Sequence, residues 1–369
     1  MSPQLEIALI AIIVSMLCSL PGIFLILRNM AMISDSITHT ILLGIVLGFF
    51  ATHDLSSPFL LVGATLVGVL TVWLTEFINK TRLVSQESAI GIVFPLLFSF
   101  AVILITNYAG SVHLDTDSVL LGELAFAPFD RLTIFGFSIA KSLVMAITLL
   151  CINGSILFIF RKEMIISTFD PVVAKLMGFT PTLLHYGLMT MVSISAVGAF
   201  EAVGSVLVVA FMVGPPLSAY LLTYKIQTMC IYTMLICTVT SIVGYIFAIL
   251  LDISIAGSIA TWIGICFIII LIVSPKKGIL TNIRNRQKQK RYYLQSIVLV
   301  HIYHHMSPLE HNELQLDTIH EHLQWSKTRV EKCIQQLLKR QYINIIQNMA
   351  LLTDKGIQKV EQSNDIKRY

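Results

Sequence analysis

A series of long apolar runs constrains what this chain can fold into. A helix needs about 20 mostly apolar residues to cross a bilayer, and runs of this length recur between Leu5 and Val273. Only 12% of the 369 residues are charged, whereas soluble domains carry about 25%. We therefore predict an all-α polytopic membrane protein. The expected spans are 5–27, 31–51, 57–79, 88–107, 133–160, 183–200, 202–223, 228–250 and 256–273.

The number of spans depends on one stretch of the sequence. Glu201 is the only break between the apolar runs 183–200 and 202–223. Counting these runs as two spans gives nine in total, and counts of eight or ten are the alternatives.

Basic residues between the runs predict the orientation. Cytoplasmic loops of membrane proteins carry an excess of Lys and Arg, and with nine spans the basic clusters fall at alternate ends. This pattern predicts an N-terminus outside the cell and a cytoplasmic C-terminus. Arg131 and Lys141 do not follow the alternation, because both lie on the expected outer side. The clusters that do follow it are Arg28, Lys80 with Arg82, Arg161 with Lys162 and Lys175, Lys225, and Lys276 with Lys277.

Two ionisable residues lie inside the second expected span. Asp35 and His39 are four residues apart, so they share one face of a helix. Charged groups in hydrocarbon cost several kcal/mol unless they are paired, hydrated or bound to a ligand. The pair therefore indicates either an ion site or, in the structural alternative, two side chains that bind each other or cap a broken helix.

Further acidic residues lie on the expected outer side. His113, Asp115 and Asp117 fall within five residues of one another, and they either attract cations to the mouth of a pore or belong to a solvated loop with helix-capping aspartates. Glu201 either extends a cation path or is a solvated turn residue.

The longest inner connection, 161–182, predicts a short surface helix. Asp170 suits the N-cap, Pro171 the first helical position and Gly178 the C-cap. An apolar stripe on this helix fits a groove on another protein or, alternatively, the lipid interface.

Three motifs together resemble those of the metal-type ABC permease family. Individually they are weak, but their order and spacing are specific, and they cover residues 1–280. They are Arg28-Asn29-Met30 followed by Asp35-Ser36-Ile37-Thr38-His39 and Gly44, Phe169-Asp170-Pro171 with Ala174 and Gly178, and Val203–Ala210 with Gly214-Pro215-Pro216 and Ala219. Thr38 departs from the family pattern, which has Ser before the His.

The resemblance implies the membrane subunit of a bacterial inner-membrane importer for manganese, zinc or iron. Such permeases work as dimers of identical or related chains, receive metal from an extracytoplasmic binding protein and are driven by a separate ATPase. Asp35 and His39 match the family's intramembrane acid and imidazole, and Asp170, Pro171, Ala174 and Gly178 match its ATPase-coupling segment. The chain has no phosphate-binding Gly-x-x-x-x-Gly-Lys-[Ser/Thr] motif, so we expect a transport subunit that is not itself an enzyme and holds no permanent cofactor.

The sequence changes character after residue 280. Residues 281–291 carry five basic groups and no acid, which predicts a juxtamembrane linker near anionic lipid. Residues 292–369 predict a small cytoplasmic α+β domain with the order of a winged helix-turn-helix: three helices, a two-stranded wing and a last helix.

This C-terminal domain is similar to the DNA-binding part of diphtheria-toxin-repressor-type, metal-dependent regulators. The resemblance implies that Ser326 opens a helix that presents basic and polar side chains to a DNA groove. The alternative is a regulatory or assembly module, because winged helices also bind proteins. The residues that would contact DNA are Lys327, Thr328, Arg329 and Lys332.

Two other functions compete with the importer subunit. An ion-coupled secondary transporter predicts inverted repeats and more intramembrane acids. A membrane-tethered transcriptional regulator predicts spans that serve only as an anchor, and nine spans with a polar pair exceed that need.

Overall fold

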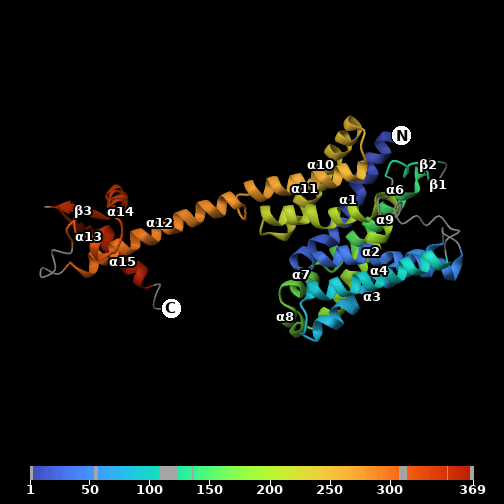
Figure 1. The fold of residues 1–369 in the computed structure, drawn as a ribbon, viewed down its shortest axis with the longest axis horizontal. Coiled ribbons are helices and arrows are strands. Elements are labelled where there is room, and N and C mark those ends of the chain that lie inside the picture. The colour runs from blue at the N-terminus through green and yellow to red at the C-terminus, as the bar shows by residue number, and fades with distance from the viewer. Residues whose placement is uncertain are drawn as a thin grey trace. The chain divides into compact units, whose positions relative to one another are not determined.

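The computed structural model describes residues 3–53, 57–108, 124–134, 137–306, 314–346 and 348–365. The chain divides into two compact units, residues 1–278 and 279–369 (Figure 1). We call them the membrane unit and the C-terminal unit and describe each by itself.

Long apolar helices build the membrane unit. Within the described residues, eight helices are long and apolar enough to cross a membrane. They are α1 (Pro3–Leu27), α2 (Ala31–Thr52), α3 (Pro58–Lys80), α4 (Gln86–Tyr108), α6 (Lys141–Ile159), α9 (Pro181–Leu222), α10 (Ile226–Leu251) and α11 (Ile255–Val273). Two shorter helices, α7 (Arg161–Phe169) and α8 (Pro171–Leu176), connect α6 to α9.

Helix α9 explains why the structure has eight such helices where nine spans are expected. The runs 183–200 and 202–223 lie in one helix of 42 residues, which bends at Gly204. Glu201 does not break the helix, and the change of direction comes from Gly204, whose φ of 76° is accessible to glycine without steric cost. The two halves run in different directions (Figure 1). At about 1.5 Å per residue, α9 is about twice as long as a bilayer core is thick.

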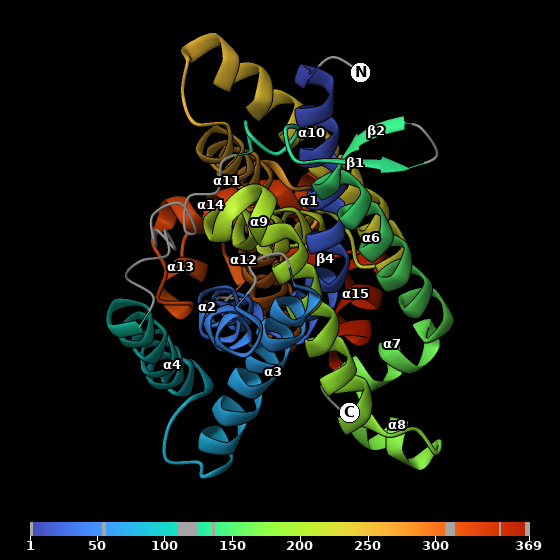
Figure 2. The same cartoon turned by 90° about the vertical axis from the view of Figure 1, so that its right-hand side faces the viewer.

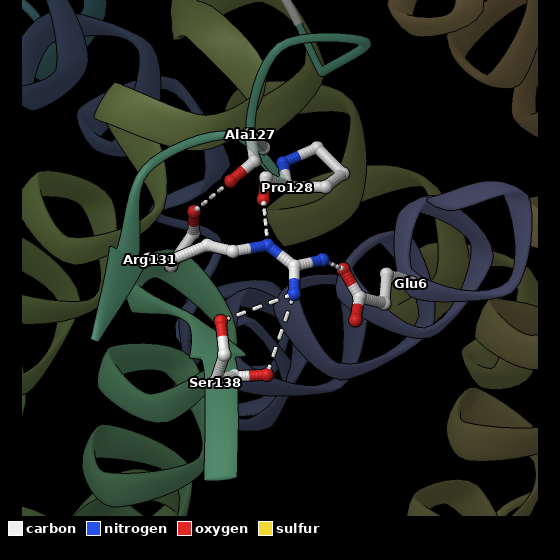
Figure 3. Close-up of polar contacts among 6 residues, drawn as sticks. Glu6, Ala127, Pro128, Arg131 and Ser138 are labelled. Carbon is white, nitrogen blue, oxygen red and sulfur yellow. Dashed lines mark hydrogen bonds and ion pairs between the residues drawn. The ribbon is translucent and has the colours of Figure 1, made fainter. Parts of the chain in front are cut away.

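A β-hairpin replaces the start of the expected span 133–160. Strands β1 (Arg131–Ile134) and β2 (Phe137–Ala140) are antiparallel, and α6 begins only at Lys141. Polar contacts of Arg131 hold the hairpin: its guanidinium donates to Pro128 O at 3.0 Å and to Ser138 Oγ at 3.2 Å (Figure 3).

The same guanidinium ties the hairpin to the start of α1. Arg131 Nη2 lies 2.7 Å from Glu6 Oε2, and Glu6 is only 4% exposed (Figure 3). Lys141 has acidic partners as well, Asp130 and Glu201. Arg131 and Lys141 are the two basic residues that depart from the alternation. In the structure each of them forms an ion pair with an acidic side chain.

Helices α1, α2 and α9 organise the interior of the membrane unit. Helix α1 packs against α6, α9 and α10, and α2 packs against α3, α4 and α9 (Figure 2). The approach of α1 to α9 is close, because a Cβ at Gly22 would lie 2.1 Å from Met212 O. Ser19 Oγ donates to Phe211 O at 2.7 Å, so a buried hydroxyl is satisfied by the backbone of α9.

The C-terminal unit has its own apolar core. The core side chains include Val298, Ile302, Leu314, Val330 and Leu337. Strands β3 and β4 form an antiparallel hairpin. The elements, in chain order, are α12 (Ile279–His304), α13 (Ile319–His322), α14 (Lys327–Lys339), β3 (Ile343–Ile346), β4 (Met349–Leu352) and α15 (Asp354–Asp365).

The expected linker 281–291 is helical and belongs to α12. The segment is rich in Lys, Arg and Gln, which favour helices, and it contains neither Gly nor Pro. The second half of the same helix buries Val298 and Ile302 in the core. Residues 281–291 are thus continuous with the helix that enters the core of the C-terminal unit.

Candidate functional site

The Asp35–His39 pair lies on the first turns of α2. His39 Nε2 is 3.6 Å from Asp35 Oδ1, and the two side chains are 23% and 47% exposed, respectively. The expected one-face geometry is confirmed. A separation of 3.6 Å is too long for a strong hydrogen bond, so the pair leaves both groups able to bind a third partner.

Aromatic rings from α4 flank the imidazole of His39. The ring centroid of Phe94 lies 5.2 Å from that of His39, and the centroid of Phe98 lies 6.2 Å away. These rings form an apolar wall beside the imidazole. Such a wall restricts the ring's rotation and directs its polar edge towards Asp35.

Close packing fixes the backbone of α2 behind the pair. A Cβ at Gly44 would lie 2.4 Å from Ala64 Cα, so α2 and α3 touch along their backbones. Thr71 Oγ1 donates to Thr40 Oγ1 at 2.8 Å, which adds a hydrogen bond between the same two helices. Small residues and hydroxyls of this kind hold helices together in membranes. Asp35 and His39 therefore stand on a rigid element.

One chain supplies only part of a metal shell. Within the described residues, no three His, Cys, Asp or Glu side chains are grouped to hold a metal ion. One carboxylate and one imidazole are the donor types that suit Mn²⁺, Zn²⁺ and Fe²⁺. Further ligands would have to come from water, a second copy or another chain.

The other acidic candidates are not brought to this pair. Glu201 lies in α9 and is 70% exposed, and its carboxylate is 3.5 Å from Lys141 Nζ. It is neither a turn residue nor part of a cluster of three ligands within the described chain. His113, Asp115 and Asp117 lie outside the described residues.

The expected inner helix forms with Asp170 as its N-cap, whereas Met177 is the C-cap and Gly178 follows it. Asp170 Oδ1 accepts hydrogen bonds from Val172 N and Val173 N, both at 3.0 Å, and Pro171 is the first residue of α8. Gly178 has a φ of 87°, which permits the chain to reverse after the helix.

Helix α8 presents an apolar surface. Val172 is 69% exposed and Leu176 is 82% exposed, whereas Ala174 is fully buried against the rest of the unit. The helix is thus anchored on one side and apolar on the other.

A second polar cluster, which the sequence analysis missed, lies near α7 and α8. Glu76 of α3 contacts His185 Nε2 through Oε1 and accepts a 2.9 Å hydrogen bond from Tyr186 Oη through Oε2. Arg28 Nη1 lies 3.1 Å from His185 Nδ1, and Arg28 Nε donates to Thr168 Oγ1 of α7 at 3.1 Å. Burial lowers the pKa of Arg28.

This cluster lines a cavity of about 640 Å³ that reaches Pro171 at the start of α8. The cluster therefore joins α1, α3, α7 and α9 at one end of the unit. A carboxylate near the end of an apolar run is the signal that would have pointed to Glu76.

Comparison with known proteins identifies the family. The profile of the ABC 3 transport family matches residues 4–274. The chain is 41% identical to the zinc transport system membrane protein TroD of Treponema pallidum, over 98% of this chain and 99% of TroD. It is 39% identical to the manganese transport system membrane protein MntD of Bacillus subtilis, over 79% of this chain and 99% of MntD.

Solved structures share the fold of the membrane unit. PsaBC from Streptococcus pneumoniae, in complex with Fab, aligns with a TM-score of 0.63 at 24% identity, over 75% of this chain and 94% of the matched chain. The residues matched by the family profile include α2 and α8. The chain belongs to the ABC 3 transport family.

Proposed function

We propose that this chain is the membrane permease of an ABC importer for a divalent transition metal, with zinc and manganese as the leading substrates and iron as a third. The Asp35–His39 pair carries the proposal, because an ionisable pair with a half-exposed carboxylate stands on a rigid, membrane-spanning helix. The family and the substrates named for TroD and MntD support it.

The pair is proposed to bind the metal in transit. Each protomer of a dimer would supply one carboxylate and one imidazole, so two protomers facing each other supply four ligands on one axis. A transit site has to release its ion, and a shell shared between two chains opens when the chains move apart. The incomplete shell in one chain supports this arrangement.

We propose that α8 couples the permease to its ATPase. A partner ATPase would receive the exposed stripe of Val172 and Leu176 in a groove, while Asp170 and Gly178 hold the ends of the helix and the buried Ala174 seats it. We expect Leu176→Asp to prevent co-purification of the ATPase while the permease stays in the membrane. Unchanged co-purification would contradict the coupling role of α8.

We further propose that the N-terminus lies outside the cell and the C-terminal unit in the cytoplasm. If each half of α9 crosses the bilayer once, the eight helices make nine crossings and the two ends lie on opposite sides; the basic clusters then favour a cytoplasmic C-terminus. The length of α9 and its bend at Gly204 support the count. An extracytoplasmic binding protein would then deliver metal on the side of the β1–β2 hairpin.

The decisive experiment is transport by the purified chain in proteoliposomes. Uptake of Mn²⁺, Zn²⁺ and Fe²⁺ is measured in competition, with and without the partner ATPase and the binding protein. The proposal expects uptake that requires both partners and ATP. Uptake that needs only an ion gradient would instead indicate a secondary transporter.

For the C-terminal unit we propose a winged helix-turn-helix that serves as a regulatory module, with DNA as the candidate ligand. Three helices, a hairpin and a last helix follow one another in the required order. Ser326 is the N-cap of α14, although its side chain makes no capping hydrogen bond. The residues proposed to face DNA are all exposed: Ser326, Lys327, Thr328, Arg329 and Lys332.

Binding to DNA is tested with the promoter of the transporter's own operon. The proposal expects a shift by the full chain in detergent that weakens in the double variant Lys327→Gln/Lys332→Gln. If neither Mn²⁺ nor Zn²⁺ nor low salt produces a shift, the DNA role is excluded, because phosphate contacts are strongest at low salt.

A further inference from the structure

A hollow in the C-terminal unit is lined mainly by positive side chains. It lies between α12 and the end of α14 and has a volume of about 350 Å³. We call it the basic pocket. Its lining residues are Lys288, Arg291, Tyr292, Gln295, Gln336, Lys339 and Arg340.

Acidic side chains of the described residues do not neutralise the charges of the basic pocket. Four of its seven lining residues are Lys or Arg and none is acidic. In the part of the chain that the structure describes, none of the four cations forms an ion pair with Asp or Glu. A hollow lined by one sign of charge concentrates the field and attracts ions of the opposite sign.

The floor of the pocket is held in place by hydrogen bonds. Gln295 is only 5% exposed, its Nε2 donates to Gln336 Oε1 at 2.7 Å and its Oε1 accepts from Arg340 Nη1 at 3.2 Å. The guanidinium carbon of Arg340 lies 5.1 Å from the ring centroid of Tyr292. Arg340 is thus oriented before any ligand arrives, and its other N–H groups remain available.

The side chains suit an anion with several oxygens, such as a phosphate. Arginine binds the oxygens of phosphate in pairs and lysine adds a compact charge, and the pocket has two residues of each kind. Its volume is near the lower end of small-molecule sites, which measure about 300–1,000 Å³. The size therefore suits a phosphorylated small molecule or the head group of a phospholipid.

Helix α12 itself shows which of its charges belong to the pocket. Lys288 and Arg291 line the pocket and are three residues apart, so they share one face of the helix. Arg286 and Lys290 are equally exposed but do not line the pocket. The pocket also uses the end of α14, whereas the residues proposed to contact DNA lie at its beginning.

We propose that the basic pocket binds a phosphate-bearing anion. The source is either a soluble phosphorylated molecule or an anionic phospholipid, and both present the same chemistry to the two arginines. Binding would link the C-terminal unit to a cellular phosphate compound or to the membrane surface. This function is independent of the metal path through α2.

The test uses the full chain and two probes. Pyrophosphate is titrated calorimetrically into the chain in phosphatidylcholine nanodiscs, and retained cardiolipin is counted by native mass spectrometry of the chain in detergent. We expect Arg291→Gln or Arg340→Gln to weaken one of these bindings about tenfold. Arg286→Gln and Lys290→Gln remove the same charge beside the pocket and should leave binding nearly unchanged.

The results distinguish a soluble ligand from a lipid and show whether the proposal fails. Pyrophosphate binding that depends on Arg291 indicates a soluble ligand, and Arg291-dependent retention of cardiolipin indicates a lipid. If Arg340→Gln unfolds the unit, Lys288→Gln repeats the test, because Lys288 takes no part in the hydrogen bonds among Gln295, Gln336 and Arg340. The proposal is overturned if neither probe binds at about millimolar concentration, or if the two control variants lose as much binding as the pocket variants.

Discussion

The Asp35–His39 pair and the Glu76–His185 pair each join a carboxylate to an imidazole in the membrane unit, but their surroundings differ. Asp35 is 47% exposed and 3.6 Å from His39. Glu76 is 22% exposed, contacts His185 directly and accepts a hydrogen bond from Tyr186. Arg28 also lies within 3.1 Å of His185.

The two pairs differ in how far their carboxylates are already satisfied by neighbouring side chains. The Glu76 carboxylate is satisfied by its neighbours, and a nearby guanidinium repels a metal cation. The Asp35 carboxylate has His39 as a partner at 3.6 Å and is 47% exposed. Side-chain type alone does not identify an ion site. Its carboxylate and imidazole must also lack close partners, so that they are able to bind an ion.

The largest effect is expected at Asp35. Asp35→Asn keeps the shape of the side chain but removes its charge, so metal uptake in proteoliposomes should fall by about 100-fold or more, given that even outer-shell partners of a metal are worth 10–100-fold. His39→Gln should act in the same direction. Glu76→Gln is the matched control, because it removes a carboxylate from the other pair.

The comparison between the two pairs is contradicted if the Glu76–His185 pair, and not the Asp35–His39 pair, is needed for transport. Uptake that persists in Asp35→Asn, together with loss of uptake per folded molecule in Glu76→Gln, would assign transport to the second pair. Both variants must first be shown to reach the membrane in equal amounts.

A smaller effect, on stability, is expected at Glu76. Glu76→Gln weakens the contact with His185 at a partly buried site, which should lower the free energy of unfolding by about 1–3 kcal/mol. Denaturant unfolding of the purified chain in detergent measures it. Metal affinity should not change, and a change in affinity with unaltered stability would show that Glu76 is a ligand.

The smallest effect is expected at Tyr186. Tyr186→Phe removes one hydrogen bond to Glu76 and leaves the ring, so the loss should be about 0.5–1.5 kcal/mol. In the Glu76→Gln background the same substitution should cost less, since its partner is already altered. Equal losses in both backgrounds would mean that the two residues do not act together.

Local features of the sequence predicted much of this molecule. The high cost of charge in a membrane singled out Asp35 and His39, and their one-face spacing is confirmed. Both ends of α8 were predicted, to within one residue, from Asp170, Pro171 and Gly178, because capping depends on neighbouring residues only.

The features that were missed depend on contacts between distant residues. Glu76 and His185 come from different helices, and the sequence of neither helix predicts that the two side chains meet. The span 133–160 was predicted to begin inside what is a hairpin, because most residues after Thr133 are apolar, and the contact that fixes the hairpin reaches back to Glu6. Glu201 is the break between two apolar runs of the sequence, but the helix continues through it and changes direction at Gly204, which has the required backbone freedom.

The ion pair between Glu6 and Arg131 has a consequence for the order of events during synthesis. Glu6 is made at the beginning of the chain, and its partner follows 125 residues later. At about 5–20 residues per second, the ribosome takes about 6–25 s to reach Arg131. During this time a carboxylate that is buried in the finished protein has no guanidinium to pair with, so the start of α1 has to wait at the water interface. The closure of α1 against the hairpin is therefore a late step, which follows the emergence of α2, α3 and α4 from the ribosome.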